Sequence, residues 1–220
     1  MADQRPTCYA CHRPLSACVC AHLRPVETAV RFVILIHPKE ERKIKNNTGR
    51  ITHLSLPNSE LITGVDFSGN DRVNHLIGDP ANACFLLYPG EESVKLDEEP
   101  LGFPGKKKVI FVLDATWQCS RKMLKSSPNL QALPSVSFVP GRTSDFRIKR
   151  QPTPEYLSTI ESVHRVLELL EKQGEERIGE EKLGRFLEPF RAMVDRQLEH
   201  IAGPDRQVRY RPPSSCPAKS

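Results

Sequence analysis

One acidic residue and the only tryptophan of the chain stand together at the end of an apolar run. Asp114 follows the apolar residues 109–113, and Trp117 comes three positions later, in the stretch VLDATWQCSRKML. A carboxylate held at the end of a rigid strand is suited to general-base catalysis. The same aspartate would be structural if it capped the next helix, and residue type leaves both alternatives open. For Trp117 the alternatives are a stacking surface beside the carboxylate and a buried core anchor.

A second group with chemical potential is the cysteine cluster at the start of the chain. Four of the seven cysteines, Cys8, Cys11, Cys18 and Cys20, fall within twenty residues in the spacing C-x2-C-x6-C-x1-C. Four cysteine ligands are typical of a closed, structural zinc site. We therefore predict bound zinc, the alternative being four thiols without a metal. Such local clustering does not fit a disulfide framework and favours a reducing compartment.

The basic residues gather in three stretches, residues 42–50, 142–150 and 206–211. The net charge of +5 is modest, so this distribution is more informative than the sum. Phe146 and Tyr210 lie among the basic residues, as expected of a surface that stacks on bases. Solvated loop charge is the alternative for any one stretch. Taken together, the three stretches favour RNA as a partner.

The hydrophobic pattern predicts the scaffold that positions these residues. Helices are expected over four segments and strands over four apolar runs: helices at 48–56, 116–127, 158–173 and 180–201, strands at 29–38, 83–90, 106–116 and 135–140. Ser158 and Glu161 form a capping-box pattern, and Pro189 should kink or split the last helix. Continuous apolar strands interleaved with helices predict an α/β fold with a mostly parallel sheet and flanking helices.

Three of the predicted strands end in polar or turn-forming residues at the edge where open parallel sheets bind ligands. These endings are His37-Pro38, Tyr88-Pro89-Gly90 and Asp114-Ala115-Thr116-Trp117. Turns alone would explain each ending separately. Neither the dinucleotide G-x-G-x-x-G fingerprint nor a P-loop accompanies them.

The chain divides into a four-cysteine zinc-binding segment (1–25), a catalytic domain (26–203) and an irregular basic tail (204–220). No apolar run approaches the ~20 residues that span a bilayer, and the opening residues have no signal-peptide core. We therefore expect a cytoplasmic protein without membrane contact. No obligate protein partner is evident.

The ordered set of motifs resembles the DTW-domain family of tRNA-uridine aminocarboxypropyltransferases. The set runs through CxxC…CxC, a strand ending in HP, NTGR, LSLPNSEL, LLYPG, LDATWQCSRKML and IKRQPTPEYLSTIESV, and so covers nearly the whole chain. The resemblance implies a SPOUT-like fold with a C-terminal trefoil knot that S-adenosylmethionine occupies. It also implies transfer of the 3-amino-3-carboxypropyl group to uracil N3 in tRNA, with release of 5′-methylthioadenosine.

Matching the family motifs to this sequence gives three sets of candidate residues beside the cysteines. The catalytic pair is Asp114, as the base, and Trp117. The cofactor pocket is expected at Leu87, Tyr88, Pro89, Leu113, Ala115, Thr116, Ser120, Leu157, Ser158 and Thr159. Binding of tRNA is expected at His37, Arg42, Lys45, Asn47, Thr48, Arg50, Arg147 and Arg150.

Two other functions fit parts of the same pattern. A SPOUT-type RNA methyltransferase would share the fold and the cofactor but transfer the methyl group. A zinc-dependent RNA-binding protein without catalysis would need the cysteines and the basic residues but not Asp114.

Overall fold

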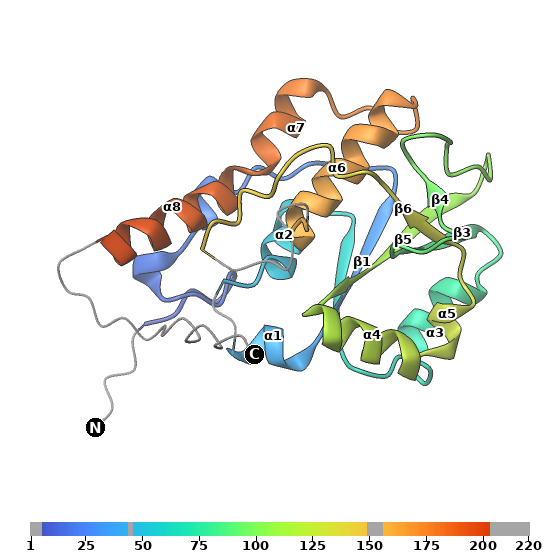
Figure 1. Ribbon diagram of the computed structural model, residues 1–220, viewed down its shortest axis with the longest axis horizontal. Helices are drawn as coiled ribbons and strands as arrows, with labels where there is room; N and C mark the ends of the chain where they lie inside the picture. Colours follow the sequence, from blue (N-terminus) through green and yellow to red (C-terminus); the bar gives the residue numbers. More distant parts are fainter. Residues whose placement is uncertain (1–5, 44–45, 149–155, 203–220) are drawn as a thin grey trace, which may run out of the picture.

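A six-stranded parallel sheet forms the centre of the molecule (Figure 1). The computed structural model describes residues 6–43, 46–148 and 156–202. The strands lie in the order β2-β1-β5-β3-β6-β4. Their bounds are Arg31–Ile36 (β1), Ser59–Thr63 (β2), Asn82–Leu87 (β3), Val94–Lys95 (β4), Lys107–Asp114 (β5) and Ser135–Ser137 (β6). Every pairing is parallel, so the predicted α/β architecture is confirmed.

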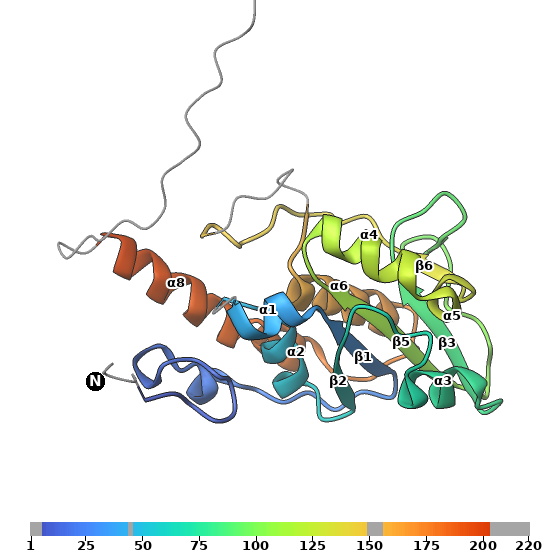
Figure 2. The same ribbon diagram turned by 90° about the horizontal axis from the view of Figure 1, so that it is seen from below.

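Helices cover both faces of the sheet (Figures 1 and 2). They span Pro38–Lys43 (α1), Gly49–Ser55 (α2), Asp71–Gly78 (α3), Trp117–Ser126 (α4), Pro128–Gln131 (α5), Thr159–Lys172 (α6), Glu180–Phe186 (α7) and Glu188–Ala202 (α8). Short 3-10 helices at Leu15–Ala17 and Cys20–His22 lie in the cysteine segment. Among the described residues, no helix has the length and apolar character needed to cross a bilayer.

Strand β5 shows why the central strands are apolar throughout. Ile110 and Val112 pack into the core that α2, α6, α7 and α8 share with the sheet. Val109 and Phe111 point to the opposite face, where they pack with residues of α3, α4 and α5. Because both faces are covered, successive residues are buried, and the strand appears in the sequence as a continuous apolar run.

The helix boundaries follow local signals in the sequence. The capping box is present, with Ser158 as the N-cap of α6 and Glu161 at its third position. The segment predicted as one C-terminal helix is split into α7 and α8 at Leu187, directly before Glu188 and Pro189, as the proline predicted. The helix predicted at 48–56 is α2, with Thr48 as its N-cap.

The sequence prediction missed five of these helices and strands, namely β2, β4, α1, α3 and the four-residue helix α5. Strand β2 is half-buried and partly polar, so it lacks an apolar run, and β4 has two residues. Helix α1 is rich in charged residues, and α3 buries only Val73 and Leu76. The tail beyond residue 203, together with Lys45 and Arg150, lies outside the described residues.

Candidate active site at the carboxyl edge of the sheet

Asp114 is the last residue of β5, which lies between β1 and β3 in the interior of the sheet. Only 5% of the residue is exposed. It pairs with Ile36 at the end of β1, and the backbone oxygen of Asp114 accepts a hydrogen bond of 3.1 Å from the backbone N–H of His37. The ends of two neighbouring strands therefore meet at the backbone of Asp114.

Side chains from two distant segments donate hydrogen bonds to the Asp114 carboxylate. The Nδ2 of Asn47 donates to Oδ2 and the Oγ1 of Thr159 donates to Oδ1, both over 2.5 Å. Such bonds are what a buried carboxylate requires, because burial of a charge without hydrogen bonds is costly. The carboxylate is thereby fixed by at least one donor on each oxygen.

The loop before α2 approaches the carboxylate unusually closely. A Cβ atom placed on Gly49 would lie 2.3 Å from Oδ2 of Asp114, so only glycine fits there. The backbone N–H of Arg50 donates to Oδ1 of Asn47 over 3.0 Å. This bond orients the Asn47 amide so that its Nδ2 faces Asp114. The NTGR motif thus forms one wall of the site.

The structure excludes one of the two alternatives for Asp114, the helix cap. The N-cap of α4 is Thr116, whose side-chain oxygen accepts a hydrogen bond from the backbone N–H of Cys119. Asp114 is therefore not a helix cap. Helices α4 and α6 both begin at this edge, at Trp117 and Thr159, and their N-terminal ends carry partial positive charge.

Three aromatic rings lie close together: Tyr88 directly after β3, Trp117 at the start of α4 and Tyr156 shortly before α6. The ring centroids of Tyr88 and Trp117 are 6.2 Å apart, and those of Trp117 and Tyr156 are 5.0 Å apart. Trp117 and Tyr156 are each 37% exposed. Trp117 is consequently not a buried core anchor, and the pair presents aromatic surface to solvent. The sequence analysis did not include Tyr156 among the candidate cofactor residues, although Tyr156 directly precedes Leu157 in the PEYLST motif.

The other predicted cofactor residues lie at or near the same edge of the sheet, and they differ in how far they are exposed to solvent. Leu87 and Leu113 are partly buried and pack against the two faces of the sheet. Ser120 is buried and donates from Oγ to the backbone oxygen of Trp117 over 3.0 Å. Pro89 and Thr116 are exposed. The structure therefore brings these residues to one edge, with Leu87 and Leu113 largely serving the core.

The residues predicted to bind tRNA are divided in the structure. Asn47 and Thr48 are buried rather than on the surface. Arg50 pairs with Glu41 over 3.0 Å, and Arg147, which is exposed, lies 3.3 Å from Asp195. The side chain of Arg42 is outside the described part of the chain, as are Lys45 and Arg150.

His37 is also buried, at the start of the turn into α1. Its Nδ1 accepts a hydrogen bond of 3.1 Å from the backbone N–H of Lys39. Burial lowers the pKa of His37, and the charges of Lys39 and Lys122 act in the same direction. The neutral imidazole therefore helps to shape the loop beside Asp114.

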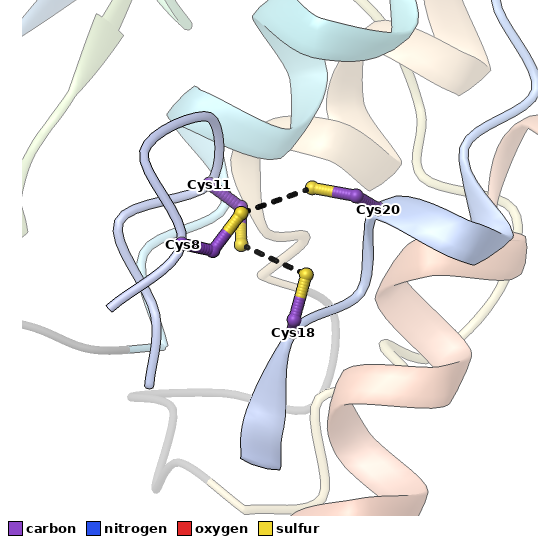
Figure 3. Close-up of side chains that lie close together, drawn as sticks. All are labelled: Cys8, Cys11, Cys18 and Cys20. Carbon is purple, nitrogen blue, oxygen red and sulfur yellow. Dashed lines mark hydrogen bonds between the residues drawn. The ribbon is translucent and has the colours of Figure 1, made fainter. Parts of the chain in front are cut away.

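The four N-terminal cysteines form a compact cluster (Figure 3). Their sulfur atoms all lie within 4.8 Å of one another, with Cys8 to Cys20 at 3.7 Å and Cys11 to Cys18 at 3.8 Å. Tetrahedral zinc with Zn–S bonds of about 2.3 Å requires sulfur separations of about 3.8 Å. Backbone hydrogen bonds from Cys11 and Ala10 lower the pKa of Cys8 to about 6, whereas burial raises the pKa of Cys20. The donor set and its spacing fit a zinc ion.

Comparison with known proteins identifies relatives over most of the chain. Residues 5–198 match the family model described as the DTW domain. The chain is 28% identical over 204 residues to tRNA-uridine aminocarboxypropyltransferase 2 of Mus musculus and 29% identical over 205 residues to the protein of that name in Macaca fascicularis. It is 30% identical over 183 residues to the protein of that name in Drosophila melanogaster.

The alignments cover the relatives less fully than they cover this chain. The mouse and macaque alignments each include 91% of this chain and 66% of the relative, slightly under two thirds. The Drosophila alignment includes 79% of this chain and 70% of the relative. No solved structure gives a significant match.

Proposed function

The chain belongs to the DTW domain family, and on this basis we propose that it is a tRNA-uridine aminocarboxypropyltransferase. The reaction would transfer the 3-amino-3-carboxypropyl group of S-adenosylmethionine to uracil N3 and release 5′-methylthioadenosine. One observation carries the proposal beyond the family match. A buried carboxylate, Asp114, is fixed between Asn47 and Thr159 at the edge of the sheet where ligands bind.

The chemistry assigns the carboxylate a definite task. Uracil N3 must lose its proton as it forms a bond to the γ-carbon of the transferred group. The bond between that carbon and sulfur breaks, and its electron pair stays on sulfur. Asp114 would accept the N3 proton, because it is the carboxylate that the fold holds at this edge. S-adenosylmethionine supplies the leaving group, so the protein needs no covalent nucleophile.

The surroundings of Asp114 offer binding surfaces for both substrates. The exposed faces of Trp117 and Tyr156 are suited to stack on an adenine or a uracil ring. The N-terminal ends of α4 and α6 favour a negatively charged group such as the carboxylate of the donor. Which carbon of the donor faces uracil decides between aminocarboxypropyl and methyl transfer, so orientation in this pocket sets the product.

Several broader expectations form part of the same proposal. We place a structural zinc ion at Cys8, Cys11, Cys18 and Cys20, in a segment separate from the catalytic domain over 26–203, with 204–220 as a tail. The SPOUT relationship and the C-terminal trefoil knot are supported by the parallel sheet and by the approach of Thr159 to β5. Transfer RNA as substrate is supported by the relatives' names. Cytoplasmic location follows from the expected reducing compartment of the cysteines.

Nucleoside mass analysis tests the proposed function. The protein is incubated with S-adenosylmethionine and unmodified tRNA, and the tRNA is digested to nucleosides. Aminocarboxypropyl transfer adds about 101 mass units to uridine, whereas methyl transfer adds about 14, since the cofactor determines the transferred group. The proposal expects the larger addition. A gain of about 14, or tRNA binding without any change of mass, would overturn it.

A further inference from the structure

Arg13 is a buried arginine between the cysteine cluster and the active site. Only 3% of the residue is exposed. Its Nη2 donates hydrogen bonds to the backbone oxygen of Asn47 over 2.9 Å and to Sδ of Met193 in α8 over 3.0 Å. The other two guanidinium nitrogens, Nε and Nη1, are buried without a hydrogen-bond partner in the described part of the chain. A buried guanidinium so placed is costly unless its charge is compensated.

The cysteine cluster lies on one side of this guanidinium. The guanidinium lies within electrostatic range of the sulfurs of Cys11, Cys20 and Cys18. Four thiolates with one Zn²⁺ carry a net charge of −2, which would compensate the buried positive charge. The backbone oxygen of Arg13 also accepts the N–H of Cys8 over 2.7 Å. Both the backbone and the side chain of Arg13 are thus tied to the proposed metal site.

The active site lies on the other side. The Asn47 carbonyl that Arg13 holds belongs to the residue whose side-chain Nδ2 donates to Asp114. Two residues further on, Gly49 contacts the same carboxylate, leaving no space for a shift of the loop toward it. A displacement of the Asn47 backbone would consequently move a hydrogen-bond donor of the catalytic carboxylate.

We propose that Arg13 is a positioning residue that couples the cysteine metal site to the active site through the backbone of Asn47. Occupation of the cluster by zinc fixes the Cys8–Arg13 turn and supplies the negative charge beside the guanidinium. The guanidinium then fixes the loop that presents Asn47 and Gly49 to Asp114. On this view, the zinc segment does more than stabilise the N-terminus, since it also maintains the geometry of the catalytic carboxylate.

The test compares Arg13→Met with a matched arginine on the outer side of the cluster. Arg196 is exposed, and its Nη1 donates to the backbone oxygen of Cys18 over 3.1 Å; within the described part of the chain, no hydrogen bond or ion pair joins its side chain to residues 46–50. Zinc content is measured by elemental mass spectrometry, and amide hydrogen exchange by mass spectrometry over residues 46–55. Arg13→Met should retain about one zinc per chain while exchange over 46–55 becomes at least about fivefold faster. Arg196→Met should leave exchange over 46–55 at the wild-type rate.

Two further measurements distinguish the proposed coupling from simple loss of the metal or of the fold. Chelation of zinc from the wild-type protein should accelerate exchange in the same segment, and Arg13→Lys, which keeps the charge, should give an intermediate rate. Unchanged exchange over 46–55 in both Arg13→Met and the chelated protein would overturn the proposal. So would acceleration spread uniformly over the sheet, because that pattern indicates only lower global stability.

The kinetic arm rests on the proposed function and separates its failure from that of the coupling. Arg13→Met should lower kcat at least about tenfold with less than a twofold change in KM for tRNA. Combined with Asn47→Ala, it should cost much less than the product of the two single effects. Fully multiplicative effects would contradict the coupling. If the wild-type protein transfers nothing to tRNA, the proposed function fails, while the exchange measurement still decides the role of Arg13.

Discussion

At the scale of single residues, the site depends on how one carboxylate is held. The sequence predicted Asp114 at a strand end and placed Thr159 and Asn47 among the candidate binding residues. It did not predict that both side chains donate to Asp114, because residues 47, 114 and 159 are distant in sequence and meet only through the fold. Gly49 of the NTGR motif can be seen in the sequence, but the sequence does not show why glycine is needed there. The reason is its close approach to Oδ2 of Asp114, which arises only in the folded protein.

Substitution of the carboxylate is the first prediction at this scale. Asp114→Asn preserves the shape of the side chain but removes its capacity to accept a proton. We expect kcat to fall by about 10² to 10⁴, the usual contribution of a general base. The melting temperature and the Kd for tRNA, measured by scanning calorimetry and filter binding, should change little. Wild-type turnover by Asp114→Asn would exclude the general-base role.

Gly49 provides a second test that leaves the carboxylate itself in place. On helix propensity alone, Gly49→Ala should stabilise α2, because alanine favours helices over glycine by about 1 kcal/mol. Its methyl group, however, would displace Asp114, and we expect kcat/KM to fall at least about tenfold, since small misplacements of reacting groups are costly.

The matched control for Gly49 is Gly184, a glycine of α7. A Cβ atom at Gly184 has no neighbouring atom within 4 Å beyond its own helix and chain neighbours. Gly184→Ala should therefore retain wild-type kcat/KM in the same steady-state assay. If Gly49→Ala were as active as Gly184→Ala, the close approach to Asp114 would have no functional importance.

At the scale of elements, helix starts were predicted better than edge strands. Ser158 and Glu161 marked the beginning of α6 because a capping box is a local pattern. Strand β2 escaped prediction because its half-buried residues have no apolar periodicity and its position is set by pairing with β1. Thr116, rather than Asp114, caps α4, a distinction that residue type could not make because both residues are good caps.

The packing of α6 against α7 gives a prediction about pH. His164 is buried in α6, where one ring nitrogen lies 2.9 Å from the backbone oxygen of Leu183 and the other 2.9 Å from Arg142. The neutral tautomer with hydrogen on Nε2 satisfies both contacts. Burial lowers the pKa of His164, and the opposing effect of Glu168 is smaller. Protonation is therefore less favourable in the folded protein than in the unfolded chain.

The sign of the effect follows from proton linkage. Below about pH 6.5 the unfolded chain binds a proton at His164 that the folded state resists, so stability falls as pH decreases from there through the folded pKa. Urea unfolding between pH 8 and pH 5 should show this loss, and His164→Gln should reduce it. The matched control for the substitution itself is His75→Gln, at an exposed position. Equal slopes in the wild type and His164→Gln would contradict the prediction.

At the scale of the whole molecule, the sequence predicted the class of fold better than its arrangement. Continuous apolar runs at β1, β3 and β5 indicated strands buried on both faces, and the observed sheet is parallel throughout. The strand order and the placement of the cysteine segment beside α8 depend on long-range contacts that local patterns do not encode (Figure 2). The contact of Arg13 with Asn47, 34 positions away, belongs to that class.

The whole molecule also brings the expected partners of the reaction to one edge of the sheet. Asp114 ends β5, Thr159 at the start of α6 donates to it, and Trp117 at the start of α4 lies against the ring of Tyr156. We propose that uracil N3 meets the aminocarboxypropyl carbon of the donor at this edge, rather than the methyl carbon.

Isotopic labelling of the donor distinguishes transfer of the aminocarboxypropyl group from transfer of the methyl group. Two reactions are run with unmodified tRNA, one with S-adenosylmethionine labelled in the methyl group and one with the label in the carboxyl carbon. We predict that only the carboxyl label enters tRNA, that the methyl label leaves in 5′-methylthioadenosine, and that Asp114→Asn suppresses the incorporation. Methyl label in the tRNA, or no label from either donor, would contradict the function proposed for this site.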